Sequence, residues 1–108
     1  MRWKLYRSAV EIDLLYVQDC PNRSLARARV EHALAQTGVA ALVREREVRT
    51  TEEAAQLGMR GSPTILIDGA DPFADDATPA TFSCRLYRDE AVVSGAPTVE
   101  QLISVLGR

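Results

Sequence analysis

The apolar residues in the first half of the chain follow two different periods. Residues 11–17 read Glu-Ile-Asp-Leu-Leu-Tyr-Val, a strand-length run too continuously apolar for a sheet with one wet face. We therefore expect a central strand covered on both faces. From Ser24 to Thr37 the apolar residues return at every third or fourth position, which predicts an amphipathic helix. Pro21 suits the first helical position, and Gly38 suits a left-handed residue that ends the helix.

A second strand and a second helix follow, and both are marked by charge. Residues 42–48 have the length of a strand, and within them residues 44–47 alternate Arg and Glu on both faces. Charges on both faces protect an exposed sheet edge from mispairing, so we expect an edge strand. Thr50 and Glu53 have the spacing of a capping box, which predicts a short helix that runs to Leu57.

The second half of the chain has shorter apolar runs. Thr64–Ile67 reads as a short strand, and the polar residues 68–81 after it predict a long loop. Residues 82–87 alternate, and we expect this strand to pair antiparallel with Thr64–Ile67. Residues 91–93 would form its hairpin partner. The core face of the strand would carry Phe82, Cys84 and Leu86.

The last helix and the element order complete the predicted fold. Thr98 and Gln101 have capping-box spacing before an amphipathic stripe that reaches Leu106. The predicted order is β-α-β-α-β-β-α. A β-α-β opening implies parallel strands joined by a right-handed crossover, and the later hairpin makes the sheet mixed. We expect an α/β class with a single domain over residues 10–108, preceded by an N-terminal extension over residues 1–9.

Composition narrows the class of protein. Of the 108 residues, 46% are hydrophobic and 26% are charged, and the net charge is −2. These values exclude wholesale disorder and argue against an electrostatic nucleic-acid binder. The sequence has no apolar run long enough to span a bilayer and no signal-peptide pattern, so we expect a cytoplasmic protein without a membrane partner.

The chain has two cysteines, and one of them lies where a thiol is activated. Cys20 follows the predicted central strand and precedes the first helix. The N-terminus of a helix stabilises a thiolate, and Arg23 adds a positive charge, whereas Asp19 acts in the opposite direction. His32, the only histidine, lies twelve residues along the helix. That separation is about 18 Å along the helix axis, which excludes a papain-like Cys–His hydrolase.

Three short motifs together resemble the thioredoxin superfamily, from about residue 10 to residue 106. They are Cys20-Pro21-Asn22-Arg23 between strand and helix, Ser62-Pro63-Thr64 at the start of the third strand, and Gly95 before the final helix. The resemblance implies a thioredoxin-like fold, with a central mixed sheet flanked by helices. It also implies that Cys20 is the nucleophile, that Pro63 is a cis-proline beside it, and that the backbone of Ser62 pairs with a bound peptide or glutathione.

The chain departs from the family at the second cysteine of its motif. Arg23 stands where a dithiol enzyme has its resolving cysteine, so the chain is more similar to a monothiol, glutaredoxin-like variant. The function that this implies is thiol–disulfide exchange through Cys20. The substrate would be a protein or small-molecule disulfide, and glutathione or another low-molecular-weight thiol would be a co-substrate rather than a bound cofactor. Arg23 would contact an anionic group of the substrate, and Thr98 would bind a carboxylate at the N-terminus of the last helix.

Cys84 has two interpretations. In the expected antiparallel pairing it lies more than about 10 Å from the Pro63 end, which favours a buried structural cysteine. A disulfide requires Cα atoms within about 7 Å, and a shift of its strand by the long loop would make Cys84 a partner of Cys20.

Two other classes of function remain open. The first is a thioredoxin-like adaptor without catalysis, in which Cys20 is a relic. The second is handling of a soft metal or organomercurial by Cys20, Cys84 and Asp19, since some similar small proteins with a Cys-Pro-Asn motif are labelled as related to organomercurial lyases. The acidic residues of the long loop do not have calcium-loop spacing, so no resident metal is expected there. These residues are Asp68, Asp71, Asp75 and Asp76.

Overall fold

The fold is a mixed α/β arrangement. The computed structural model describes residues 9–74, 81–90 and 92–107, with Phe82 and Cys84 described by their backbone. The predicted extension up to residue 8, the loop residues Asp75 and Asp76, and Ala91 therefore lie outside the described residues.

A three-stranded mixed sheet lies at the centre. It is built from β1 (Val10–Tyr16), β2 (Ala41–Glu47) and β4 (Thr64–Ile67) in the order β2-β1-β4. β1 pairs parallel with β2 and antiparallel with β4. The predicted central and edge strands are thus confirmed within the described residues.

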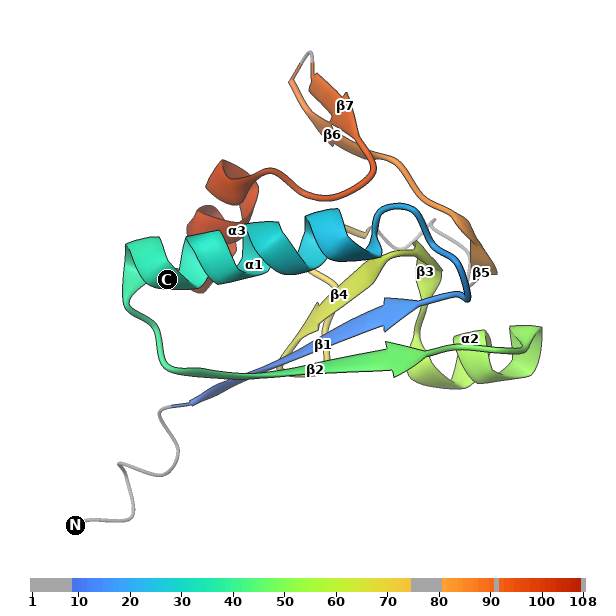
Figure 1. Cartoon of the computed structure of the whole chain (residues 1–108). Helices are drawn as coiled ribbons and strands as arrows, with labels where there is room; N and C mark the ends of the chain where they lie inside the picture. Colours follow the sequence, from blue (N-terminus) through green and yellow to red (C-terminus); the bar gives the residue numbers. More distant parts are fainter. Residues whose placement is uncertain (1–8, 75–80, 91, 108) are drawn as a thin grey trace, which may run out of the picture.

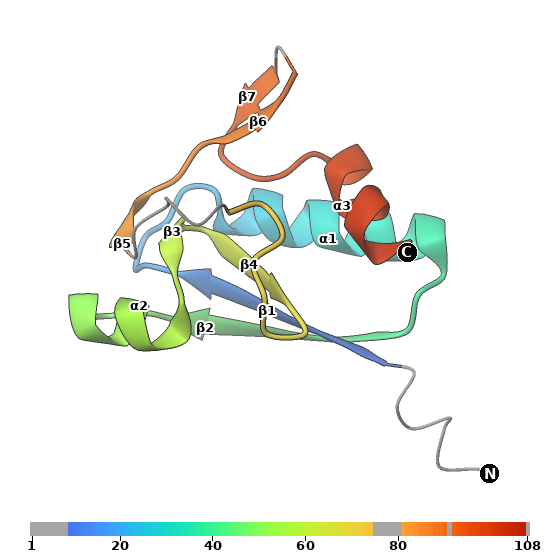
Figure 2. The same cartoon turned by 180° about the vertical axis from the view of Figure 1, so that it is seen from behind.

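Leu14 and Leu15 are neighbours in the sequence and belong to the cores on the two faces of the sheet. Leu14 packs with residues of α1 (Arg23–Thr37) and α3 (Val99–Leu106). Leu15 packs with residues of α2 (Thr51–Leu57) and the turn that follows it. Figures 1 and 2 show α1 and α3 over one face of the sheet and α2 over the other. The continuous apolar run in β1 exists because both faces are covered.

The helix ends follow the predicted capping with one exception. Gly38 and Gly58 end α1 and α2 in the left-handed conformation, and Thr98 and Gln101 form a complete capping box. The exception is Pro21, whose predicted place at the first helical position is wrong. α1 begins at Arg23, and Asn22 is the N-cap residue, so Pro21 stays in the turn before the helix.

The strands after β4 differ from the prediction. β5 (Thr81–Cys84) pairs parallel with β3 (Arg60–Ser62), and Ser62 lies opposite Cys84. The predicted antiparallel pairing with β4 is therefore wrong. The predicted strand also breaks after β5 and resumes as β6 (Tyr87–Asp89), which forms a hairpin with β7 (Val92–Ser94). Figure 1 shows this hairpin projecting from the body of the molecule.

The break reverses which residues point inward. Leu86, expected on the core face, is 70% exposed, whereas the Arg85 side chain is only 9% exposed. Arg85 turns inward because its guanidinium forms an ion pair with Asp71 and lies over the ring of Tyr87.

Gly61 allows the chain to pass Arg85 closely. Its φ is +113°, a conformation that residues with side chains rarely adopt. A β-carbon at Gly61 would lie 2.7 Å from the β-carbon of Arg85. Position 61 therefore requires glycine for both backbone and space.

The described helices include none with the length and apolar character needed to cross a membrane.

We predict that Gly61→Ala lowers the free energy of unfolding much more than Gly69→Ala does. Gly69 also has a positive φ, +86°, but a β-carbon there would meet nothing within 4 Å. We expect Gly69→Ala to cost about 1 kcal/mol from backbone strain. Gly61→Ala should cost at least about 2 kcal/mol more, because Arg85 must also move. Urea unfolding measures both, and equal losses would show that the contact with Arg85 is unimportant.

Candidate functional site

Cys20 lies in the turn between the carboxyl end of β1 and the start of α1. Its backbone N–H donates to the carbonyl of Val17 at 3.1 Å, and its own carbonyl accepts from the N–H of Arg23 at 3.4 Å. The residue is partly exposed, and its thiol is free. Asp19 before it has a φ of +60°, which closes the turn. A thiol is thus held before a helix N-terminus and within reach of solvent.

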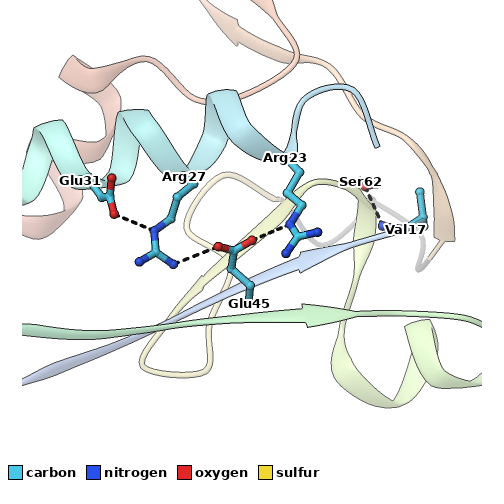
Figure 3. A network of polar contacts seen from close by, with 6 residues as sticks. All are labelled: Val17, Arg23, Arg27, Glu31, Glu45 and Ser62. Atoms are coloured by element: carbon cyan, nitrogen blue, oxygen red, sulfur yellow. Dashed lines mark hydrogen bonds and ion pairs between the residues drawn. The ribbon is translucent and has the colours of Figure 1, made fainter. Parts of the chain in front are cut away.

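Ser62 and Pro63 lie beside this turn. The Ser62–Pro63 peptide bond is cis, so the cis bond that the resemblance implies is confirmed. Ser62 is 1% exposed, and its hydroxyl accepts a hydrogen bond from the backbone N–H of Val17 at 3.0 Å. Figure 3 shows this bond at the end of β1. Val17 therefore connects the Cys20 turn to Ser62.

The backbone of Ser62 already has a partner within the chain. Its carbonyl accepts from the N–H of Arg85 at 3.1 Å, immediately after the residue pair Ser62 and Cys84. The resemblance assigns this backbone to a bound peptide or glutathione. In the structure, β5 occupies that edge.

Tyr87 links Pro63 to the surroundings of Cys20. The residue is 4% exposed, and its hydroxyl donates to the carbonyl of Pro63. Burial raises the pKa of the Tyr87 phenol. Negative charge on Asp71 and Cys20 acts in the same direction, whereas Arg85 opposes it. The phenol therefore stays protonated at neutral pH and donates its hydrogen bond to the Pro63 carbonyl.

A buried ion pair between Arg85 and Asp71 packs against Tyr87. Arg85 and Asp71 approach to 2.6 Å, with side chains 9% and 6% exposed. The guanidinium lies 4.4 Å from the centre of the Tyr87 ring and donates to the Thr64 hydroxyl at 3.4 Å. Phe73 meets the same ring edge-on at 5.8 Å. The ring of Tyr87 is thus held by the buried guanidinium of Arg85, whose charge is balanced by Asp71.

Asn22 and Arg29 attach the loop before α3 to α1. A β-carbon at Gly95 would lie 2.2 Å from the side-chain amide of Asn22, so glycine allows the two segments to touch. Arg29 donates to the Ser94 hydroxyl at 2.9 Å and to the Ala96 carbonyl at 3.0 Å. The short loop that includes Gly95 is therefore packed beside the residues that follow Cys20.

Arg23 does not turn toward Cys20. Its side chain binds Glu45 at 2.6 Å and lies 3.8 Å from the centre of the Tyr16 ring. Figure 3 shows Arg23 and Arg27 extending from α1 to the same Glu45 carboxylate. The hydrogen bond to Glu45 raises the pKa of Arg23, so the guanidinium stays charged and paired.

Thr98 also has internal partners. Its hydroxyl accepts from the N–H of Gln101 at 3.0 Å and donates to the carboxylate of Asp89 at 2.9 Å. We expected Thr98 to bind a carboxylate at the N-terminus of α3. In the structure this carboxylate is that of Asp89.

His32, Asp68 and Asp71, which the sequence also singled out, make contacts within the chain. His32 is exposed and lies beside Gln36 on α1. Asp68 accepts from the backbone N–H of Glu11, and Asp71 pairs with Arg85. In residues 9–74, 81–90 and 92–107, no three side chains of the metal-binding types gather into a group.

An open cleft of about 630 Å³ lies at the carboxyl ends of β1 and β2, next to the Cys20 turn. Its lining residues are Val17, Gln18, Glu47, Val48 and Arg49. Arg49 has a side chain that is 76% exposed, with Glu47 at 3.2 Å. The sequence patterns did not identify the cleft or Tyr87. The alternation of residues 82–87 assigned Tyr87 to the outer face, and cleft-lining residues carry no pattern of their own.

No protein-family model matches the chain, and no curated protein matches it. The function must therefore be argued from the geometry of the site.

We predict that Asp71→Ala lowers the free energy of unfolding by about 3–5 kcal/mol, because it leaves the Arg85 cation buried without a counter-ion. A matched control is Glu31→Ala, which removes a carboxylate from Arg27 at the exposed surface. An exposed pair of this kind contributes about 0.5 kcal/mol or less. Urea unfolding compares the two variants, and similar losses would contradict the role given to the buried pair.

Proposed function

We propose that the chain is a thioredoxin-like protein that exchanges thiols and disulfides through Cys20. The observation that carries this proposal is the position of Cys20. It is a partly exposed free thiol between the carboxyl end of the central strand and the N-terminus of α1. Such a position favours the thiolate, which is the nucleophile in disulfide exchange.

The arrangement around Cys20 supports the same reading. A parallel β1-α1-β2 unit, an antiparallel β4 and helices on both faces agree with the architecture expected for such a protein. Tyr87 holds the Pro63 carbonyl beside the Cys20 turn, and Val17 bonds to both Cys20 and Ser62. These contacts attach the turn that carries Cys20 to Ser62 and fix the carbonyl of Pro63.

The proposed reaction needs one thiolate from the chain. The Cys20 thiolate attacks one sulfur of a disulfide, forms a new S–S bond to it and expels the other sulfur as a thiolate, which takes a proton from water. A low-molecular-weight thiol then attacks the mixed disulfide and regenerates Cys20. Over the full cycle one low-molecular-weight thiol replaces one half of the substrate disulfide, that half leaves as a free thiol, and the number of S–S bonds is unchanged.

The substrate that fits best is a small disulfide rather than an extended peptide. A peptide would need the Ser62 backbone, whose carbonyl already accepts from Arg85. A small disulfide needs access to Cys20 and room for its leaving group. The cleft beside Val17 offers that room, and its lining includes the exposed ion pair of Arg49 with Glu47.

We predict that the folded chain makes Cys20 a better nucleophile than the same residue in a flexible peptide. The rate of reaction with a small symmetrical disulfide at pH 7 is measured for Cys84→Ser and for a synthetic peptide of residues 16–26. We expect the folded chain to react at least about threefold faster, because the turn holds the thiol before the N-terminus of a helix, where negative charge on the attacking sulfur is stabilised. The double variant Cys20→Ser/Cys84→Ser serves as the control and should not react.

A rate equal to or below that of the peptide would contradict the redox proposal. It would leave the second candidate, a thioredoxin-like binding protein without catalysis. The observation that favours this candidate is the projecting β6–β7 hairpin, which leaves Val92 and Val93 55% and 45% exposed.

A further inference from the structure

The backbone of Cys84 lies opposite Ser62, a residue of the candidate site. It ends β5, and its Cα pairs with that of Ser62 in the parallel ladder of β3 and β5. Neighbouring strands lie about 4.8 Å apart. The sequence analysis expected Cys84 to lie far from the Pro63 end. In the structure its backbone lies beside that of Ser62, the residue before Pro63.

Hydrogen bonds on both sides hold β5 in this register. Before Cys84, the N–H of Thr81 donates to the carbonyl of Met59 at 3.0 Å. After it, the N–H of Arg85 donates to the carbonyl of Ser62 at 3.1 Å. The buried ion pair between Arg85 and Asp71 anchors the end of the strand. The backbone of Cys84 is thus fixed between two attachment points.

A short chain of contacts leads from this position to Cys20. Ser62, opposite Cys84, accepts a hydrogen bond from Val17 through its hydroxyl. Val17 in turn accepts a hydrogen bond from the backbone N–H of Cys20. The structure therefore brings the two cysteines of the chain to the same end of the fold, although 64 positions separate them in the sequence.

We propose that Cys84 is the resolving thiol for Cys20. The motif Cys20-Pro21-Asn22-Arg23 has no resolving cysteine, because Arg23 stands at that position and is paired with Glu45. Cys84 would supply the missing second thiol. β5 brings the backbone of Cys84 to the Ser62 edge, where an external peptide would otherwise pair. This inference rests on the proposed function, since Cys20 must first form a mixed disulfide.

The resolving step balances without a further oxidant. The Cys84 thiol loses its proton to water and attacks the Cys20 sulfur of the mixed disulfide. A Cys20–Cys84 bond forms, and the bound half of the substrate leaves as a thiolate. Two molecules of a low-molecular-weight thiol then reduce the intramolecular disulfide and are joined as their own disulfide.

The test uses glutathione disulfide as the probe on the full chain at low protein concentration. Wild type, Cys84→Ser, Cys20→Ser and the double variant Cys84→Ser/Ser83→Cys are treated, quenched with acid and mapped by mass spectrometry without reduction. The double variant is the matched control, because it moves the thiol by one residue and hence to the other face of the strand.

We expect wild type to yield a peptide pair joined through Cys20 and Cys84 within one chain. Cys84→Ser should stop at glutathionylated Cys20, and the matched control should behave like Cys84→Ser. Loss of glutathione from the mixed disulfide should be at least about tenfold faster in wild type than in Cys84→Ser, because the step is intramolecular. The wild-type map decides the question even if a variant fails to fold.

Two results would overturn the inference. Wild type that accumulates glutathionylated Cys20 with Cys84 unmodified, or that links Cys84 between chains, would show that Cys84 does not resolve Cys20, while the proposed function would stand. Wild type in which Cys20 takes up no glutathione would overturn both.

Discussion

The buried pair of Arg85 and Asp71 fixes the segment between β5 and β6, which contacts the candidate site. A desolvated guanidinium is tolerated only with a counter-ion, and here the side chains are 9% and 6% exposed at 2.6 Å. Turning Arg85 inward leaves Leu86 exposed and brings Tyr87 to the carbonyl of Pro63. In the same segment the N–H of Arg85 donates to the carbonyl of Ser62, where β5 lies beside β3.

Sequence reasoning succeeded where structure depends on near neighbours. The two-sided strand around Leu14, the charged edge strand, the helix caps and the position of Cys20 all follow from local periodicity and short motifs. It failed for β5, because alternation grouped apolar residues on one face and took Arg85 for an outer residue. The counter-ion Asp71 lies fourteen residues earlier in what read as a polar loop, so no local pattern joins the two.

Several residues that the resemblance singles out have internal partners. Arg23 binds Glu45, Thr98 binds Asp89, and the Ser62 carbonyl accepts from Arg85. Cys20 differs, because its thiol is free and partly exposed. The proposed chemistry therefore concentrates on Cys20. β5 fills the Ser62 edge and brings the backbone of Cys84 to the same edge.

Stoichiometry tests the two-thiol account most directly. One equivalent of a symmetrical aromatic disulfide, whose thiolate absorbs light, is added to the reduced chain, and the released thiolate is counted. If Cys20 attacks and Cys84 resolves, wild type releases two thiolates per disulfide, whereas Cys84→Ser releases one. A single thiolate per disulfide from wild type would contradict the account.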